Sequence, residues 1–274
     1  MDPGLYVVAT PIGNLGDLSP RAAEALRNAS LVLAEDTRVT GKLLAHAGSK
    51  AAMRRYDDHS TDKDRAAIVQ RLGTDAVALV SDAGTPLISD PGYKLVRAAR
   101  EAGHMVRTIP GPCAAIAGVT ISGLPTDRFL FLGFLPAKSK ARSDAIAEIA
   151  SVRATLVIYE GASRLGDTLL ALAAQLGPRE AAVARELTKL HEECVTGTLP
   201  QLAARYAEVI PKGELVVIVG PPSDTEEVTD DTLDSLLDEA LAKLSPSRAA
   251  AEVAEQLGIP RKRAYSRALE RSRK

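Results

Sequence analysis

Short apolar segments rich in Val, Leu, Ile and Ala alternate with longer amphipathic segments along most of the chain. Several of the short segments are almost continuously apolar, a pattern typical of strands that are buried on both faces of a sheet. Eight segments are predicted as strands: Leu5–Ala9, Leu31–Ala34, Ala76–Val80, Met105–Ile109, Phe129–Leu132, Leu156–Tyr159, Ala182–Arg185 and Leu215–Val219. The alternation of strands with helices predicts an α/β protein with mostly parallel sheets.

Two of the helices between these strands begin at recognisable residues. Ser19 precedes Pro20, so a capping residue stands before a proline at the first helical position. Asp62 precedes another helical pattern, which ends near Gly73.

Two segments rich in Gly and Pro indicate boundaries within the chain. One is Gly111–Gly123, and the other is the run Gly220-Pro221-Pro222. We therefore predict three parts: an N-terminal α/β domain of residues 1–115, a C-terminal α/β domain of residues 116–222, and a small module of residues 223–274.

Charge is balanced over the whole chain but segregated near its end. Lys and Arg number 34 and Asp and Glu 35, a net charge of −1, which excludes a global basic field for nucleic acid. Asp224–Glu239 holds eight acidic residues and no basic one, whereas Arg261–Lys274 holds seven basic residues and one glutamate. This asymmetry predicts an acidic, flexible linker and a basic tail for a polyanionic partner; the alternative is a tail that is merely solvated.

The tail also has the pattern of a helix-turn-helix. A helix is predicted from Ser245-Pro246-Ser247 to Leu257, a tight turn at Gly258-Ile259-Pro260, and a second, basic helix over Arg261–Arg271. In this motif the second helix contacts nucleic acid. The alternative is a two-helix appendage for packing or dimerisation.

Several other classes of protein do not fit the sequence. No apolar run approaches the roughly 20 residues of a membrane span, and the N-terminal segment lacks the layout of a signal peptide, so we expect a soluble, cytoplasmic protein. Cys113 and Cys194 form no disulfide framework. The group His191–Cys194 makes a poor chelate on a strand, because neighbouring side chains point to opposite faces, and we expect no metal site.

Polar loops rich in Gly and Pro follow four of the predicted strands. They are Ala9–Asp17, Glu35–Arg38, Ser81–Gly92 and Pro110–Ala115. In open α/β sheets ligands bind beyond the carboxyl ends of the strands, so these loops are expected to converge on one crevice. Gly and Pro let the backbone approach a ligand closely.

The second half has two loops dense in ionisable residues, Tyr159–Arg164 and Arg185–Glu192. They either form salt-bridged scaffolding, as Glu160–Arg164 and Arg185–Glu186, or line a cleft for a charged ligand. Phe129 and Phe131 share one strand face, where core packing is favoured over base stacking.

These loops, in this order, resemble the tetrapyrrole-methylase superfamily, and within it the ribosomal RNA small subunit methyltransferase I family. The similar blocks, which cover about residues 5–220, are LYVVATPIGNLGDLSPRA, AEDTR, VSDAGTPLISDPGY, IPGPCAA, LPTDRFLFLGFLP, YEGASR and RELTKLHEE. The basic helix-turn-helix tail is similar to the C-terminal module of that family.

The resemblance implies two unlike α/β domains with S-adenosylmethionine in the cleft between them. It also implies methylation of the ribose 2′-oxygen of a cytidine in the decoding centre of small-subunit (16S) rRNA, and related two-domain methylases suggest a homodimer. The residues implied to hold the cofactor are Ser81, Asp82, Ala83, Gly84, Thr85, Pro86, Ile88, Pro110, Gly111, Cys113, Ala114, Ala115, Tyr159, Leu187 and Glu214. Thr10–Asp17 and Glu35–Arg38 are expected to face the RNA.

Methyl transfer from a sulfonium is an in-line displacement, so orientation of the 2′-oxygen is expected to contribute most, up to about 7–11 kcal/mol. A base must also take the hydroxyl proton. The catalytic candidates are Asp36, Glu160, Lys189 and His191. The RNA-binding candidates are Asn14, Arg38, Lys138, Lys140, Arg142, Arg261, Lys262, Arg263 and Arg267.

Two other functions remain open from the sequence. One is a methylase of the same fold that acts on a small tetrapyrrole, which has no use for a basic tail. The other is a DNA-binding ligand sensor that performs no methyl transfer. Loops rich in Asp, Glu and Arg at the strand ends favour an enzyme over the sensor.

Overall fold

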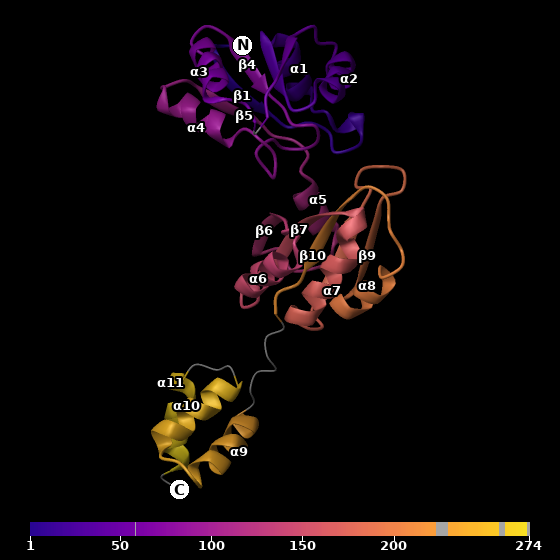
Figure 1. Cartoon of the computed structure of the whole chain (residues 1–274). Coiled ribbons are helices and arrows are strands. Elements are labelled where there is room, and N and C mark those ends of the chain that lie inside the picture. The colour runs from indigo at the N-terminus through magenta and orange to yellow at the C-terminus, as the bar shows by residue number, and fades with distance from the viewer. Residues whose placement is uncertain (58, 223–229, 258–260, 273–274) are drawn as a thin grey trace. The chain divides into compact units, whose positions relative to one another are not determined.

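The computed structural model describes residues 1–57, 59–222, 230–257 and 261–272 (Figure 1). The chain divides into two compact units, Met1–Pro221 and Pro222–Lys274. No helix among the described residues is long and apolar enough to cross a membrane.

The first half of the larger unit is built on a five-stranded sheet in the order β3-β2-β4-β1-β5. All of its strand pairs are parallel. The strands are β1 (Gly4–Val8), β2 (Leu31–Ala34), β3 (Ala52–Arg55), β4 (Ala76–Leu79) and β5 (Val106–Ile109), and the helices are α1 (Pro20–Asn28), α2 (Thr37–Ala47), α3 (Asp62–Arg71) and α4 (Tyr93–Glu101). Leu26 and Leu43 from α1 and α2 pack in one core cluster, and Ile68 and Leu95 from α3 and α4 pack in another. Helices therefore cover both faces, as parallel sheets require.

The second half is built on a five-stranded sheet in the order β6-β7-β10-β8-β9. Its strands are β6 (Phe129–Phe134), β7 (Thr155–Gly161), β8 (Glu180–Arg185), β9 (Glu193–Thr198) and β10 (Glu214–Val219). Only β6 and β7 pair in parallel, and the other three pairs are antiparallel. The prediction of mostly parallel sheets is therefore wrong for this half.

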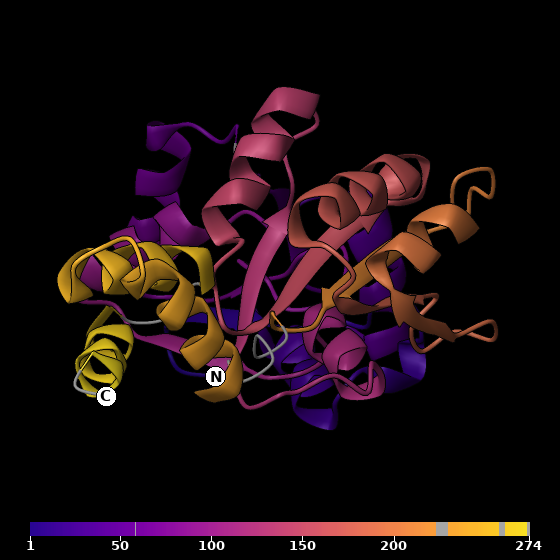
Figure 2. The ribbon, with the colours of Figure 1, turned by 90° about the horizontal axis from the view of Figure 1, so that it is seen from below.

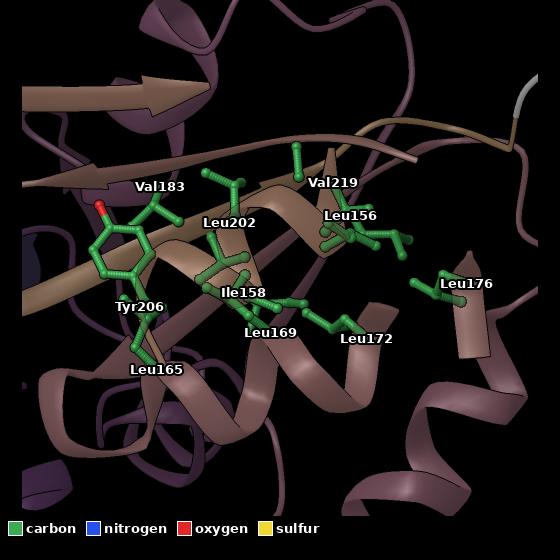
Figure 3. Close-up of a cluster of buried hydrophobic side chains, with 14 of the residues drawn as sticks. Leu156, Ile158, Leu165, Leu169, Leu172, Leu176, Val183, Leu202, Tyr206 and Val219 are labelled. Atoms are coloured by element: carbon green, nitrogen blue, oxygen red, sulfur yellow. The ribbon is translucent and has the colours of Figure 1, made fainter. Parts of the chain in front are cut away.

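The prediction of parallel pairing failed in the second sheet because burial, and not strand direction, makes its strands apolar. Its helices are α5 (Ala114–Ile121), α6 (Ser139–Ile149), α7 (Leu165–Leu176) and α8 (Leu199–Arg205), and two short 3-10 helices, η1 (Leu15–Asp17) and η2 (Ala162–Arg164), complete the unit. Helices α6, α7 and α8 lie along one face, where Ile146, Leu169 and Leu202 meet the strands (Figures 2 and 3). Ala115 and Val119 of α5 pack on the other face. A strand covered on both sides is apolar whichever way its neighbours run.

All eight predicted strands are present, with ends that differ by at most two residues from the prediction. The two strands that were not predicted, β3 and β9, each lie at one edge of a sheet, and their residues are all exposed or half-buried. Ser19 caps α1 as predicted, by accepting a hydrogen bond from the Ala22 N–H at 3.1 Å. Helix α3 instead starts from a capping box of Thr61 and Asp64, so Asp62 lies inside its first turn.

Helix α5 occupies most of the Gly- and Pro-rich segment 111–123 in which a boundary was predicted. The boundary predicted after residue 115 falls inside this helix, which follows β5 and packs on the second sheet. Gly118 of α5 approaches that sheet closely, because a Cβ there would lie 3.0 Å from Val216 Cγ1.

The smaller unit consists of α9 (Asp230–Leu241), α10 (Pro246–Leu257) and α11 (Arg261–Arg271), packed around Leu233, Leu237, Val253, Ala264 and Ala268. The two predicted helices of the helix-turn-helix are confirmed; the turn predicted at Gly258–Pro260 lies outside the described residues. The predicted acidic linker is a helix from Asp230 onward, and its residues 224–229 also lie outside the described residues. Apolar residues at helical spacing on α9 explain why an acidic segment packs here.

Candidate functional site

A cavity of about 470 Å³ lies between the loops that follow the first sheet and the second sheet of the larger unit. Its wall from the first half is Ile12, Glu35, Asp82, Ala83, Gly84, Thr85, Ile88, Ser89, Asp90 and Ala114. Its wall from the second half is Phe134, Tyr159, Glu186, Leu187, Lys189, Gly213, Glu214, Leu215 and Val216. The volume is within the range of roughly 300–1,000 Å³ that small-molecule sites occupy.

Hydrogen bonds hold the three loops of the first wall together. The Thr10 N–H donates to the Gly84 carbonyl at 2.8 Å, and the Gly84 N–H donates back to the Thr10 carbonyl at 3.2 Å. The Thr10 hydroxyl donates to the Ser81 carbonyl at 3.3 Å, and the Thr85 hydroxyl to the Pro112 carbonyl at 2.9 Å. The convergence that the sequence predicted for the loops after β1, β4 and β5 is therefore present.

Backbone strain concentrates in two of the loops at the cavity. Leu87, Ser89, Glu186 and Thr188 are the non-glycine residues with positive φ in the described part of the chain, with φ of 75°, 64°, 51° and 66°. Such conformations cost about 1–3 kcal/mol each and cluster at ligand sites, where the surrounding structure holds them.

The cavity wall carries more carboxylates than cations. The acidic residues are Glu35, Asp82, Asp90, Glu186 and Glu214, and Lys189 is the basic residue. Lys189 Nζ forms an ion pair with Glu186 Oε1 at 2.9 Å, and Asp82 Oδ1 accepts a hydrogen bond from the Asp36 N–H at 3.0 Å. The excess of carboxylates suits a ligand that carries positive charge and hydroxyl groups.

Tyr159 joins the second wall to the start of α5. Its hydroxyl accepts a hydrogen bond from the Ala115 N–H at 3.0 Å and lies 3.9 Å from Cys113 Sγ. Its ring makes edge contacts with Phe131 at 4.9 Å and Phe134 at 5.7 Å. Burial raises the pKa of the Tyr159 phenol well above its ordinary range, so the hydroxyl stays neutral.

Nine of the predicted cofactor residues line the cavity: Asp82, Ala83, Gly84, Thr85, Ile88, Ala114, Tyr159, Leu187 and Glu214. Six do not, namely Ser81, Pro86, Pro110, Gly111, Cys113 and Ala115; Ser81 and Ala115 are buried directly behind the wall. The cofactor prediction did not include nine residues that line the cavity: Ile12, Glu35, Ser89, Asp90, Phe134, Glu186, Gly213, Leu215 and Val216. Of these, Ile12 and Glu35 belong to the two loops that were expected to face the RNA. Six of these nine residues lie in the sequence blocks that carry the family resemblance. The other three, Gly213, Leu215 and Val216, lie outside those blocks, and only the fold brings them to the cavity.

Of the four catalytic candidates, Lys189 lines the cavity. Its side chain crosses to the first loop, because a Cβ on Gly13 would lie 2.5 Å from Lys189 Cε. Glu160 is fully buried and points to the opposite face of β7 from Tyr159. The Glu160 carboxylate accepts from the Thr168 hydroxyl at 2.6 Å and lies 3.3 Å from Arg164 Nε, so it has the scaffolding role.

Asp36 and His191 also lie outside the cavity wall. The Asp36 carboxylate caps α2 by accepting from the Arg38 N–H at 2.8 Å. Hydrogen bonds from Arg38 hold the pKa of Asp36 far below its ordinary value, which makes it a weak proton acceptor. His191 is exposed in the turn before β9, and no group of three or more potential metal ligands occurs among the described residues. Arg185 pairs with Glu193 at 2.6 Å, whereas the scaffolding alternative paired it with Glu186.

The RNA-binding candidates of the larger unit are placed unequally. Asn14 is exposed and caps η1 through the Gly16 N–H at 2.9 Å, and the Arg38 side chain is 88% exposed beside Asp36. Lys138 and Lys140 are exposed at the start of α6. Arg142 is 8% exposed, which argues against a phosphate contact.

In the smaller unit, Arg261, Lys262 and Arg263 are exposed on the first turn of α11. Arg267 instead binds Asp234 of α9 through two hydrogen bonds of 2.6 and 2.8 Å. This bidentate pair packs α11 against α9, so Arg267 has a structural role that the sequence did not indicate.

Comparison with known proteins places the chain in a family. Residues 4–203 match the model of Tetrapyrrole (Corrin/Porphyrin) Methylases, and residues 226–272 match that of the RsmI C-terminal HTH domain. The chain is 57% identical to Ribosomal RNA small subunit methyltransferase I of Erythrobacter litoralis over 271 residues, covering 98% of this chain and 96% of that protein. It is 46% identical to the protein of the same name from Escherichia coli O157:H7, covering 97% and 94%.

Solved structures show the same fold. Diphthine synthase superposes with a TM-score of 0.63 at 17% identity, covering 79% of this chain and 89% of the other. Uroporphyrin-III C-methyl transferase from Thermus thermophilus, complexed with S-adenyl homocysteine, superposes with a TM-score of 0.55 at 23% identity, covering 79% and 97%. The chain belongs to the tetrapyrrole methylase superfamily and, within it, to the ribosomal RNA small subunit methyltransferase I family.

Proposed function

We propose that this protein is an S-adenosylmethionine-dependent methyltransferase that methylates the ribose 2′-oxygen of a cytidine in the decoding centre of small-subunit (16S) rRNA. The observation that carries the proposal is identity of 57% over nearly the full length of a relative named for methylation of small-subunit rRNA. Both the catalytic unit and the helix-turn-helix unit are matched, and the second unit distinguishes the RNA enzyme from tetrapyrrole methylases.

The cavity suits S-adenosylmethionine in its charge and in its apolar surface. The cofactor carries a cationic sulfonium and an ammonium group, and the carboxylates of Asp82 and Glu214 line the cavity. Ile88 and Leu187 supply apolar surface for packing. When bound, the cofactor supplies an electrophilic methyl group.

The residues of the chain would then bind the cofactor, orient the acceptor and shield the reacting groups from water. The nine predicted residues that line the cavity would contact the cofactor. The other six predicted residues would support the wall without lining it: Ser81, Pro86, Pro110, Gly111, Cys113 and Ala115. Lys189, paired with Glu186, is the catalytic candidate placed to contact the reacting groups. Orientation of the acceptor against the methyl group would contribute most of the rate.

RNA recognition is assigned to exposed basic residues in both units. Arg38, Lys138 and Lys140 would contact phosphates near the cavity, with Asn14 nearby, and Arg261, Lys262 and Arg263 would hold RNA on α11. The target nucleotide would be flipped out of its stack to reach the cavity.

A homodimer in the cytoplasm is part of the proposal, and sedimentation of the purified protein tests the dimer.

The test is transfer of labelled methyl from S-adenosylmethionine to small ribosomal subunits that lack the modification, with free rRNA and a porphyrinogen in parallel. Label in RNA, with the neighbouring phosphodiester bond resistant to alkali, is the expected result. Label on a base, or in the porphyrinogen alone, would contradict the proposed acceptor.

A further inference from the structure

A second cavity, of about 120 Å³, lies beside the first in the larger unit. Residues of the connection between β3 and α3 form one side, and the first residues of α4 form the other. Asp90 lines both cavities, so the two spaces adjoin at this residue. An acceptor for methyl transfer must lie next to the donor, and the second cavity is in that position.

The second cavity has cationic groups that a phosphate can reach. Lys94 is exposed, and Arg65 lines the cavity while pairing with Asp62, whose side chain is 96% exposed. The Arg65 side chain is 16% exposed, whereas Asp62 stands in solvent, so a phosphate in the cavity can compete with Asp62 for Arg65. Asp57, which also lines the cavity, is already neutralised by Arg55 at 2.9 Å.

An aromatic ring stands at the same place. Tyr93 is 65% exposed, although a ring of this size is usually covered in a folded protein. Tyr93 lines the second cavity, so the exposed ring stands at its opening. Exposed tyrosine beside a cation is the combination on which unpaired bases stack while their phosphates are bound.

The size of the cavity limits what it can hold. At about 120 Å³ it is smaller than the roughly 300 Å³ at which sites for whole small molecules begin. It can hold a phosphate group, with the ribose beside Asp90 and the base outside on the ring of Tyr93.

We propose that this second cavity is the acceptor subsite for the RNA backbone. A phosphate binds Lys94 and Arg65, the attached base stacks on Tyr93, and Asp90 accepts a hydrogen bond from the ribose hydroxyl that faces the first cavity. The proposal rests on the proposed function, since it assumes an RNA acceptor.

The test uses the full chain, with small ribosomal subunits lacking the modification as acceptor. The variants are Lys94→Glu and Tyr93→Ala, and the matched control is Lys50→Glu, an exposed lysine before β3 that lines neither cavity. Calorimetry of S-adenosylmethionine binding and thermal melting establish that each variant is folded and has an intact first cavity.

K94E is expected to raise the KM for subunits about tenfold and to lower the salt dependence of RNA binding by about one phosphate contact. Y93A is expected to raise the KM several-fold, and Asp90→Asn to lower kcat at least tenfold when S-adenosylmethionine is saturating. The proposal is overturned if K94E and Y93A methylate subunits with the kcat/KM of K50E. Failure of the wild-type chain to methylate any RNA would instead overturn the proposed function.

Discussion

The backbone N–H of Ala115 donates a hydrogen bond to the hydroxyl of Tyr159 across 3.0 Å. Ala115 lies in the first turn of α5, and Tyr159 lies on the central part of β7, so one side chain fixes the start of that helix against the second sheet. Because Ala114 and Tyr159 both line the main cavity, this bond also sets the shape of its wall.

Replacement of this tyrosine by phenylalanine tests the bond directly. Tyr159→Phe leaves the Ala115 N–H without its acceptor, and a lost hydrogen bond of this kind costs about 1 kcal/mol of unfolding free energy. We expect a loss of that size in urea denaturation and a several-fold weaker binding of S-adenosylmethionine by calorimetry. Tyr265→Phe, in the other unit, serves as control and should change neither quantity.

Substitution of Glu160 is expected to lower the stability of the protein, whereas substitution of Lys189 is expected to lower its activity. Glu160→Ala removes the partner of Arg164 and of the Thr168 hydroxyl in a fully buried place, and breaking a buried pair costs about 3–5 kcal/mol. Lys189→Ala removes an exposed side chain at the cavity and should leave unfolding almost unchanged while lowering kcat/KM.

Two quantities are measured for each variant: the free energy of unfolding and the rate of methyl transfer per folded molecule. If Glu160→Ala does not fold, Glu160→Gln keeps the shape and should show the same separation in weaker form. Equal activity of the Lys189 variant and wild type would remove Lys189 from the candidates.

The pairing of α9 with α11 should make the smaller unit sensitive to acid. Hydrogen bonds from Arg267 lower the pKa of Asp234, and the charges of Arg267 and Arg271 lower it further. A carboxylate with a lowered folded pKa contributes stability that is fully present above its unfolded pKa, near 4, and is lost as pH falls through the folded value. The protection of amides in α9 and α11, measured as exchange relative to the intrinsic rate at each pH, should therefore fall below about pH 4.

Asp234→Asn should remove most of that pH dependence, because the amide has no charge to lose. Glu252→Gln, an exposed position on α10, is the control. Identical acid sensitivity in wild type and Asp234→Asn would show that the pair does not hold these helices.

Deletion of residues 225–274 should weaken RNA binding and spare binding of S-adenosylmethionine, because the larger unit is compact without them. The matching substitution replaces Arg261, Lys262 and Arg263 by alanine, which should lower the salt dependence by about one phosphate contact for each residue that binds RNA. The measurements are RNA affinity at several salt concentrations and calorimetry of the cofactor. Equal loss of both affinities would contradict this division between the units.

Local patterns in the sequence are enough to locate eight of the ten described strands and the loops that meet at the cavity. Apolar runs located eight strands because burial on both faces excludes polar residues, and Ser19 located a helix start because capping is a local interaction. The loop blocks around Ser81–Gly92 and Pro110–Ala115 identified the family without any knowledge of strand direction.

Tertiary structure alone decided which side chains face the cavity and which partners they have. Tyr159 and Glu160 are neighbours in an ionisable loop block, but alternation along β7 sends one to the cavity and the other to Thr168. Arg267 belongs to a basic tail, yet Asp234, which is 33 residues earlier, binds it. The antiparallel pairs of the second sheet and the edge strands β3 and β9 were also hidden, because pairing depends on contacts between distant segments that local periodicity does not encode.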